Sequence, residues 1–181
     1  MKNILLIGCG HMGGSLMSGW SNSKNYTISV IDKKKYTILK KKNRNKNIKF
    51  FKSINDINDQ NNFDFIIFAT RPLELTNVFK ELKNVNFNKK SIAISVIAGK
   101  KTEIFKKNLL NISKIVRVMP NMPALIGEGV HCIYTNKSIN KKEIKEIDNL
   151  FSLSGKTLFF NSETFIDKAT AVSCLLYTSD A

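Results

Sequence analysis

Three glycines near the N-terminus have a spacing that suits the binding of a diphosphate. The run Gly8-Cys9-Gly10-His11-Met12-Gly13 follows the pattern G-x-G-x-x-G. It comes directly after the apolar run Asn3–Ile7 and opens a stretch whose apolar residues recur every fourth position. A strand that ends in this pattern and leads into a helix is typical of the first βα unit of a Rossmann fold. We therefore predict that the loop holds the pyrophosphate of a dinucleotide, because a helix N-terminus offers unpaired amides and partial positive charge to an anion.

Each glycine of this loop is expected to meet a different steric requirement. Gly8 permits the tight turn, Gly10 lets the backbone approach a pyrophosphate closely, and Gly13 lets the helix pack against the strand. His11 and Met12 stand at the start of the helix and are expected to lie against the bound cofactor. We expect His11 to be a bystander near the phosphates rather than a catalytic group.

An acidic residue and a run of lysines end the second predicted strand. Asp32 stands about twenty residues past the last glycine, where a carboxylate binds the ribose hydroxyls of the adenosine and favours NAD. Lys33, Lys34 and Lys35 follow at once and suit the 2′-phosphate of NADP, or else simply begin a solvated helix. The pattern leaves NAD and NADP both open, and we prefer NADPH.

These residues are expected to sit on a doubly wound α/β fold. Apolar runs alternate with amphipathic stretches, which predicts a mostly parallel sheet with flanking helices. The predicted strands are Asn3–Ile7, Thr27–Ile31, Ile48–Phe51, Phe63–Ala69, Ile92–Val96, Ile115–Met119, Val130–Tyr134 and Thr157–Phe160. The first predicted helix follows the glycine loop, and the next four cover Lys33–Lys42, Pro72–Leu82, Thr102–Leu110 and Lys141–Phe151. The last begins near Glu163 after a cap at Asn161 or Ser162. Pro120–Pro123 is expected to be an irregular loop.

The composition argues against several other classes of protein. The net charge is +15, but the basic residues are scattered, and the densest stretch, 33–49, has no interleaved aromatic platforms, so we do not expect a nucleic-acid partner. Three cysteines and two histidines show no metal-ligand or disulfide spacing, so no metal is expected. No apolar run approaches the roughly 18 residues of a membrane span, and the N-terminus does not read as a secretory signal. We therefore expect no membrane association and a cytoplasmic protein.

Four segments, taken in order, read ILLIGCGHMGGSLMSGW, FDFIIFATRPLE, SVIAG and RVMPNMPALIGEG, and the last is the most specific. Together they resemble the corresponding segments of the pyrroline-5-carboxylate reductases. A later stretch, SETFIDKATAVS, resembles the entry into the helical dimerisation domain of that family. The resemblance covers residues 1 to 173. It departs from the family at Thr70-Arg71-Pro72, where the family usually has Val-Lys-Pro, and arginine keeps the charge of lysine but not its shape.

The resemblance implies an activity and a set of site residues. The expected reaction is the NAD(P)H-dependent reduction of 1-pyrroline-5-carboxylate to L-proline, the last step of proline biosynthesis. The nicotinamide site would be lined by Thr70, Arg71, Pro72, Ala98 and Gly99. Asn121 would border the substrate end of the cleft, or else cap its own loop. The proton donor is unknown. Another imine or β-hydroxyacid reductase on the same fold and a non-enzymatic nucleotide-binding protein remain alternatives.

The resemblance also implies how the chain is divided. Residues 1–162 are expected to form the NAD(P)-binding domain, and residues 163–173 the start of a helical domain through which the full-length family members form homo-oligomers. The last residues, CLLYTSDA at 174–181, match a translated sequencing adapter rather than the family, so we expect a non-native tail. On this interpretation the chain is truncated and has little or no reductase activity.

Overall fold

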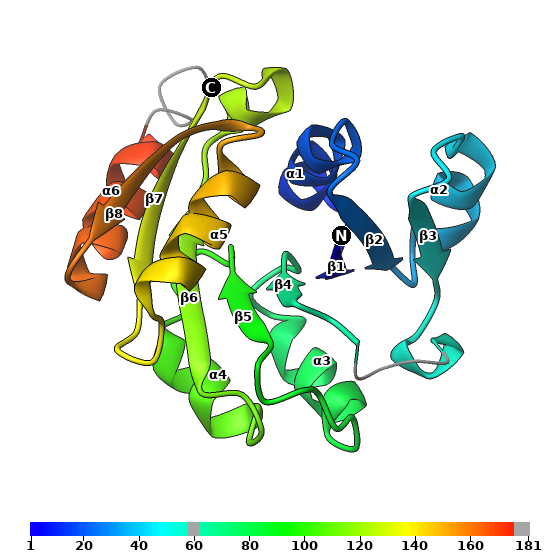
Figure 1. Cartoon of the computed structure of the whole chain (residues 1–181), viewed down its shortest axis with the longest axis horizontal. Helices are drawn as coiled ribbons and strands as arrows, with labels where there is room; N and C mark the ends of the chain where they lie inside the picture. The colour runs from blue at the N-terminus through cyan, green and yellow to red at the C-terminus, as the bar shows by residue number, and fades with distance from the viewer. Residues whose placement is uncertain (58–61, 176–181) are drawn as a thin grey trace.

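Within the described residues, 1–57 and 62–175, eight strands form one sheet in the order β3-β2-β1-β4-β5-β6-β7-β8 in a computed structural model (Figure 1). The strands are β1 (Lys2–Ile7), β2 (Tyr26–Ile31), β3 (Ile48–Phe51), β4 (Phe65–Phe68), β5 (Ile92–Ser95), β6 (Lys114–Met119), β7 (Gly129–Thr135) and β8 (Gly155–Phe160). The helices are α1 (His11–Ser21), α2 (Tyr36–Lys42), α3 (Leu75–Leu82), α4 (Thr102–Asn108), α5 (Lys141–Phe151) and α6 (Glu163–Leu175), with short 3₁₀ helices η1 (Ile54–Asp56) and η2 (Met122–Ile126). Residues 176–181, most of the expected non-native tail, lie outside the described residues.

The sheet reverses its order between β1 and β4. Both neighbours run parallel to β1, with Ile4 opposite Ile28 of β2 and Phe65 of β4. The pairs β2–β3, β4–β5 and β5–β6 are also parallel, β6–β7 is antiparallel, and β8 runs parallel to β7. The prediction of a doubly wound, mostly parallel sheet is therefore confirmed. In such sheets ligands bind beyond the carboxyl ends of the strands at the reversal point.

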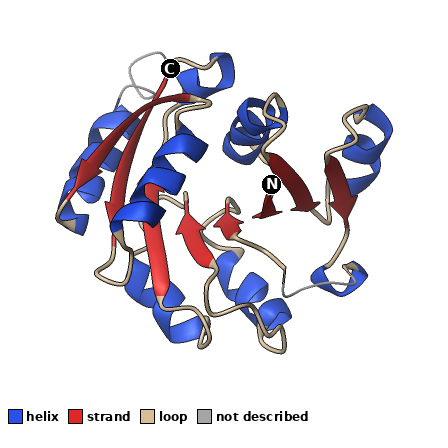
Figure 2. Cartoon of the chain, in the orientation of Figure 1, coloured by secondary structure: helices blue, strands red, loops and turns tan. Residues whose placement is uncertain are grey.

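Helices cover both faces of the sheet (Figures 1 and 2). On the face of α1, α2 and α5, Trp20 and Leu150 lie in one buried cluster, and the indole Nε1 of Trp20 donates a 3.0 Å hydrogen bond to the Leu150 carbonyl. On the face of α3 and α4, three phenylalanine rings pack together, with Phe68 5.1 Å from Phe105 and 6.0 Å from Phe79 between centroids. The first core fixes the angle of α1 on the sheet, and hence the position of the glycine loop that precedes it.

Two boundaries differ from the prediction for local reasons. The helix expected over 33–42 begins at Tyr36, because the Asp32 carboxylate accepts hydrogen bonds from the amides of Lys34 and Lys35 and turns the chain first. The loop expected at 120–123 instead enters the 3₁₀ helix η2, whose first turn contains a proline. Proline suits that position because its fixed φ matches the helix and its missing amide is not needed there.

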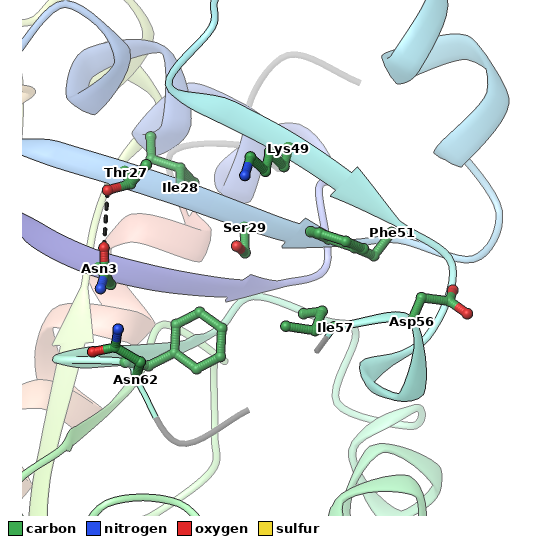
Figure 3. Close-up of a pocket in the computed structure, with 10 residues that line it drawn as sticks. Asn3, Thr27, Ile28, Ser29, Lys49, Phe51, Asp56, Ile57 and Asn62 are labelled. Atoms are coloured by element: carbon green, nitrogen blue, oxygen red, sulfur yellow. Dashed lines mark hydrogen bonds between the residues drawn. The ribbon is translucent and has the colours of Figure 1, made fainter. Parts of the chain in front are cut away.

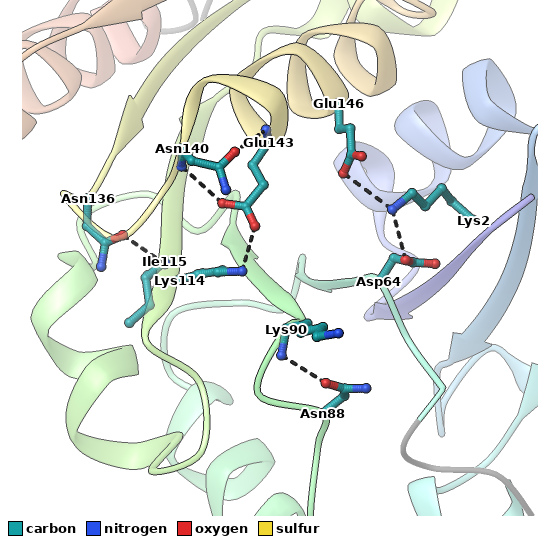
Figure 4. Close-up of polar contacts among 10 residues, drawn as sticks. All are labelled: Lys2, Asp64, Asn88, Lys90, Lys114, Ile115, Asn136, Asn140, Glu143 and Glu146. Carbon is teal, nitrogen blue, oxygen red and sulfur yellow. Dashed lines mark hydrogen bonds and ion pairs between the residues drawn. The ribbon is translucent and has the colours of Figure 1, made fainter.

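Ion pairs at the amino ends of the strands attach α5 to the sheet (Figure 4). The Lys2 ammonium lies 3.0 Å from Asp64 and 3.3 Å from Glu146 of α5. Lys114 of β6 lies 2.5 Å from Glu143, and Glu143 also closes a capping box with Asn140 at the start of α5. These contacts lie at the edge of the sheet opposite to the glycine loop, so we assign them to the support of the fold.

Strand β7 carries a fully buried histidine. The Nε2 atom of His131 lies 3.0 Å from Ser154 Oγ, and that hydroxyl donates to the Phe151 carbonyl. Because the Ser154 hydroxyl has a single proton and donates it to Phe151, we assign the proton of the neutral ring to Nε2. The other ring nitrogen, Nδ1, is buried and has no hydrogen-bond partner among the described residues. A second proton on this ring would consequently be buried without an acceptor.

Stability is therefore expected to fall in mild acid. Burial lowers the pKa of His131 below its usual 6.5, and a hydrogen bond involving Ser154 opposes this only in part. As the pH falls through 6.5, the unfolded chain binds a proton that the folded chain binds only at a lower pH. Stability is therefore full above pH 6.5 and decreases below it. The total loss is about 1.4 kcal/mol for each unit by which the pKa of the folded chain lies below that of the unfolded chain. Urea unfolding at pH 7.5 and 5.5 measures the loss. The variant His131→Gln should show a weaker pH dependence, and an unchanged dependence in it would contradict this assignment.

Candidate dinucleotide-binding site

The glycine loop lies at the carboxyl end of β1, beside the point where the strand order reverses. Gly8 has a φ of +93°, a conformation that residues with a side chain rarely adopt. A Cβ at this position would lie 2.8 Å from the carbonyl oxygen of Ala69 and 2.9 Å from the Cγ2 atom of Thr70. The tight turn after β1 therefore passes directly against the end of β4, and glycine is required there for two independent reasons.

Gly13 and Gly10 differ sharply in their surroundings. A Cβ on Gly13 would lie 2.3 Å from the Gly8 carbonyl oxygen, so the first turn of α1 packs on the loop with no room for a side chain. A Cβ on Gly10 would meet nothing within 4 Å. The space beside Gly10 is open in the structure, as expected where a pyrophosphate approaches the backbone.

The first turn of α1 presents its amides to that space. Gly10 is the N-cap residue, and its carbonyl accepts the first helical hydrogen bond from Gly14 at 2.9 Å. The amides of His11, Met12 and Gly13 come before that bond and have no acceptor within the helix. The His11 side chain is exposed, and Met12 is half-buried against the core. This arrangement suits an anion at the start of α1.

Asp32 lies beside the loop, but the neighbouring backbone engages its carboxylate. Its Oδ2 accepts a 2.8 Å hydrogen bond from the Cys9 amide, and its Oδ1 accepts from the amides of Lys34 and Lys35 at 3.1 and 2.9 Å. Lys35 Nζ in turn donates to the Cys9 carbonyl at 3.2 Å. Asp32 therefore fastens the glycine loop to the end of β2. Burial and the nearby Asp32 charge raise the pKa of the Cys9 thiol to about 11, so Cys9 is not a thiolate nucleophile.

A pocket lies between the ends of β2 and β4, and we call it the nucleotide pocket. Among its lining residues are Gly8, Asp32, Lys33 and Thr70, four of the positions predicted to bind a cofactor. The structure therefore brings together residues that are up to 62 positions apart in the sequence. Lys34, Lys52 and Glu74 also line this pocket, and the sequence reasoning did not assign Lys52 or Glu74 to the site.

The remaining predicted positions follow the next strands along the same edge. Arg71 and Pro72 are exposed in the turn after β4, and Ala98 and Gly99 are exposed after β5, where Gly99 has a φ of +70°. Because β4 and β5 are parallel neighbours, both turns lie at the edge that carries the glycine loop.

Asn121, at the end of β6, uses its side chain within its own loop. Its Oδ1 accepts a 2.8 Å hydrogen bond from the Val130 amide, and it is the N-cap residue of η2. The Asn121 side chain thus joins the two ends of its own loop without a capping hydrogen bond to η2, and its place beside a substrate stays a prediction.

Glu163 contacts the segment that follows the Gly99 turn, which the sequence alone did not predict. Its carboxylate accepts hydrogen bonds from the amide and hydroxyl of Thr102 at 2.7 and 3.0 Å, immediately after the Gly99 turn. It also lies 3.3 Å from Arg117, which is 1% exposed on β6 and reaches Asp167 at 2.7 Å. The start of α6 is thereby connected to the turn at the end of β5. The sequence did contain a signal for this contact, because Arg117 is a charged residue inside the apolar run 115–119 and needs an acidic partner when it is buried.

A second pocket lies on the α3 face of the sheet and is lined by polar strand residues (Figure 3). Asn3 accepts a 2.9 Å hydrogen bond from Thr27, and Ser29 and Lys49 lie beside them. This pocket lies along the strands rather than at their carboxyl ends and contains none of the predicted site residues. Among the described residues, no group of three or more potential metal ligands was found, and no helix is long and apolar enough to cross a bilayer.

The sheet order, the close turn at Gly8 and the exposed amides of α1 define a Rossmann-type α/β protein. Comparison with known families is more specific. The family described as NADP oxidoreductase, coenzyme F420-dependent, matches residues 3–99, and the chain belongs to this family.

Individual relatives extend the match along the chain. The pyrroline-5-carboxylate reductase of Haemophilus influenzae is 29% identical over 178 residues, which cover 95% of this chain and 62% of the relative. The Aquifex aeolicus enzyme of the same name is 34% identical over 112 residues, which cover 62% of this chain and 40% of the relative. This chain thus spans about three fifths of the length of the Haemophilus influenzae enzyme.

Solved structures agree in fold. A pyrroline-5-carboxylate reductase from Coxiella burnetii superposes with a TM-score of 0.82 at 26% identity and covers 95% of this chain and 63% of its own. The Plasmodium falciparum pyrroline carboxylate reductase, solved with NADP bound, gives a TM-score of 0.76 at 24% identity, with 99% of this chain and 64% of that chain covered.

Proposed function

We propose that this chain is the nucleotide-binding part of a pyrroline-5-carboxylate reductase, which reduces 1-pyrroline-5-carboxylate to L-proline with NADPH or NADH. The observation that carries the nucleotide assignment is the contrast within the glycine loop, closed at Gly8 and Gly13 and open at Gly10. The family description supports NADP, and the names of the similar enzymes support the substrate.

The residues of this chain would hold the dinucleotide along the carboxyl edge of the sheet. The amides of His11, Met12 and Gly13 would hold the pyrophosphate, and the nucleotide pocket beside Asp32 and Lys33 would take the adenosine. When bound, the dinucleotide supplies a hydride to the imine carbon. The protein contributes binding, orientation and exclusion of water.

The nicotinamide end would lie at the turns that follow β4 and β5. Those turns contain Thr70, Arg71, Pro72, Ala98 and Gly99, and Asn121 would border them from the loop after β6. The side-chain oxygen of Asn121 is engaged with Val130, so its amide group is what it would offer to a substrate. We assign no proton donor within this chain.

We also propose the division of the chain and its partners. Residues 1–162 would form the nucleotide-binding domain, and residues 163–173, the larger part of α6, would begin a helical domain through which two chains associate. Phe159 and Phe165 are 40 and 48% exposed at this end of the molecule, which supports burial there against further protein. The enzyme would act in the cytoplasm on a small-molecule substrate.

Titration of the purified chain with NADPH and NADH tests the nucleotide assignment. We expect saturable enhancement of nicotinamide fluorescence, because the ring leaves water on binding, and loss of that signal when ADP-ribose competes. The chain of 181 residues is expected to show little turnover of 1-pyrroline-5-carboxylate. A folded sample that binds neither nucleotide would contradict the proposal.

A comparison of substrates tests the assigned reaction. A protein that joins this chain to a helical domain of the family should reduce 1-pyrroline-5-carboxylate and leave β-hydroxyacids unchanged. The reverse preference would instead support the alternative of a β-hydroxyacid dehydrogenase on the same fold.

A further inference from the structure

An ion pair joins the two walls of the nucleotide pocket. Lys34 lies in the turn between β2 and α2, and Glu74 lies in the turn between β4 and α3. The Lys34 Nζ atom is 2.6 Å from Glu74 Oε1, and both residues line the pocket. The side chains are 77 and 39% exposed, so the pair lies at the mouth of the pocket in contact with solvent.

Other charged side chains at this end of the pocket contact the backbone or an aromatic ring. The carboxylate of Asp32 accepts three backbone amides, which leaves little capacity for the hydroxyls of a ribose. Lys35 is bonded to the Cys9 carbonyl, and Lys52 lies over the ring of Tyr36 at 5.5 Å. Lys33 also lines the pocket, but in the described part of the chain Lys34 is the lining lysine that is ion-paired with a carboxylate.

The contact between Lys34 and a carboxylate resembles the contact that a lysine makes with the 2′-phosphate, the group that distinguishes NADP from NAD. NADP carries a phosphate on the adenosine ribose where NAD has a hydroxyl, and an ammonium binds either a carboxylate or a phosphate as a point charge. The hydrogen bond from Lys34 lowers the pKa of Glu74, so Glu74 is an anion near neutral pH. Exposed pairs of this kind are weak, and a phosphate with nearly two charges can replace the carboxylate.

We infer that Glu74 occupies, on Lys34, the position of the 2′-phosphate of NADP, and that it thereby reduces the preference of the protein for NADPH over NADH. This inference rests on the proposed nucleotide-binding function. On binding NADPH, Lys34 exchanges the carboxylate for the phosphate, whereas on binding NADH the Lys34–Glu74 pair remains closed. Glu74 is thus a specificity-determining residue that competes with one cofactor and not with the other.

The variant Glu74→Gln tests this competition. It keeps the size of the side chain and removes its charge, so the Kd for NADPH should decrease about threefold while the Kd for NADH stays within experimental error. Lys34→Gln should weaken NADPH binding about threefold or more and leave NADH unaffected. In the double variant, Glu74→Gln should give no further gain in affinity for NADPH. The ammonium of Lys34, for which the carboxylate and the phosphate compete, is absent there.

A matched control separates this contact from the general charge of the pocket. Glu81 lines the same pocket, and its replacement by glutamine changes the net charge equally. If Glu81→Gln tightens NADPH binding as much as Glu74→Gln, or if the Glu74→Gln gain persists without Lys34, the inference is wrong. Equal changes for NADPH and NADH would also contradict it. A wild-type chain that binds neither nucleotide would overturn the proposed function and this inference with it.

Discussion

Alanine at Gly13 is expected to destabilise the protein by about 3 kcal/mol and to abolish nucleotide binding. The added Cβ would lie 2.3 Å from the Gly8 carbonyl oxygen and 3.1 Å from the Ala69 Cβ. The first of these contacts is with backbone in a turn that is itself fixed against β4, so relief requires moving α1 or the loop. For a chain of this length, the melting temperature should fall by roughly 6 to 12 °C. Thermal melts and a titration with NADPH measure the two effects.

Alanine at Gly10 is the matched control, because the same methyl group there enters open space. Gly10 has φ and ψ of −69° and −160°, which alanine adopts readily, and no atom lies within 4 Å of the new Cβ. Stability should stay within about 0.5 kcal/mol of wild type. Nucleotide affinity should nevertheless decrease about tenfold, because the methyl group occupies the approach of the pyrophosphate to the backbone. Unchanged affinity in a folded Gly10→Ala protein would place the diphosphate elsewhere.

The elements that carry the site could be predicted because their signals are local. A strand, a glycine at each tight position and a helix start lie within residues 3–20, so the loop follows from neighbouring residues alone. The apolar runs of the central strands β4 and β5 are buried on both faces, and all four residues of each strand are buried. Parallel strands with intervening helices then leave few topologies to consider.

The parts that could not be predicted depend on contacts between distant residues. The spacing of Asp32 from the glycine loop indicates a ribose ligand, but the amides of Cys9, Lys34 and Lys35 compete for the same oxygens. The partnership of Lys34 with Glu74 spans 40 residues and has no sequence signature. A pattern gives the location of a charged side chain, whereas its partners depend on the folded geometry.

Replacing Arg117 by methionine is expected to destabilise the protein by about 3 kcal/mol and to loosen α6 from the sheet. The arginine is 1% exposed and bridges the carboxylates of Glu163 and Asp167. Its removal leaves two acids without a counter-charge beside the sheet. Because Glu163 also holds the Thr102 amide, the turn at Gly99 should lose order along with α6. Urea unfolding and hydrogen exchange at the amides of 98–103 and 163–168 measure these effects.

The compensating variant distinguishes loss of the ion pairs from loss of packing. Methionine fills much of the volume of the arginine stem, so adding Glu163→Gln and Asp167→Asn removes the uncompensated charges and should recover most of the stability. The glutamine oxygen can still accept the hydrogen bond from Thr102, so the turn after β5 should regain its protection from exchange. If the triple variant is as unstable as Arg117→Met alone, then the shape of the guanidinium and not its charge fixes α6. In that event, the link between α6 and the proposed nicotinamide turn is steric rather than electrostatic.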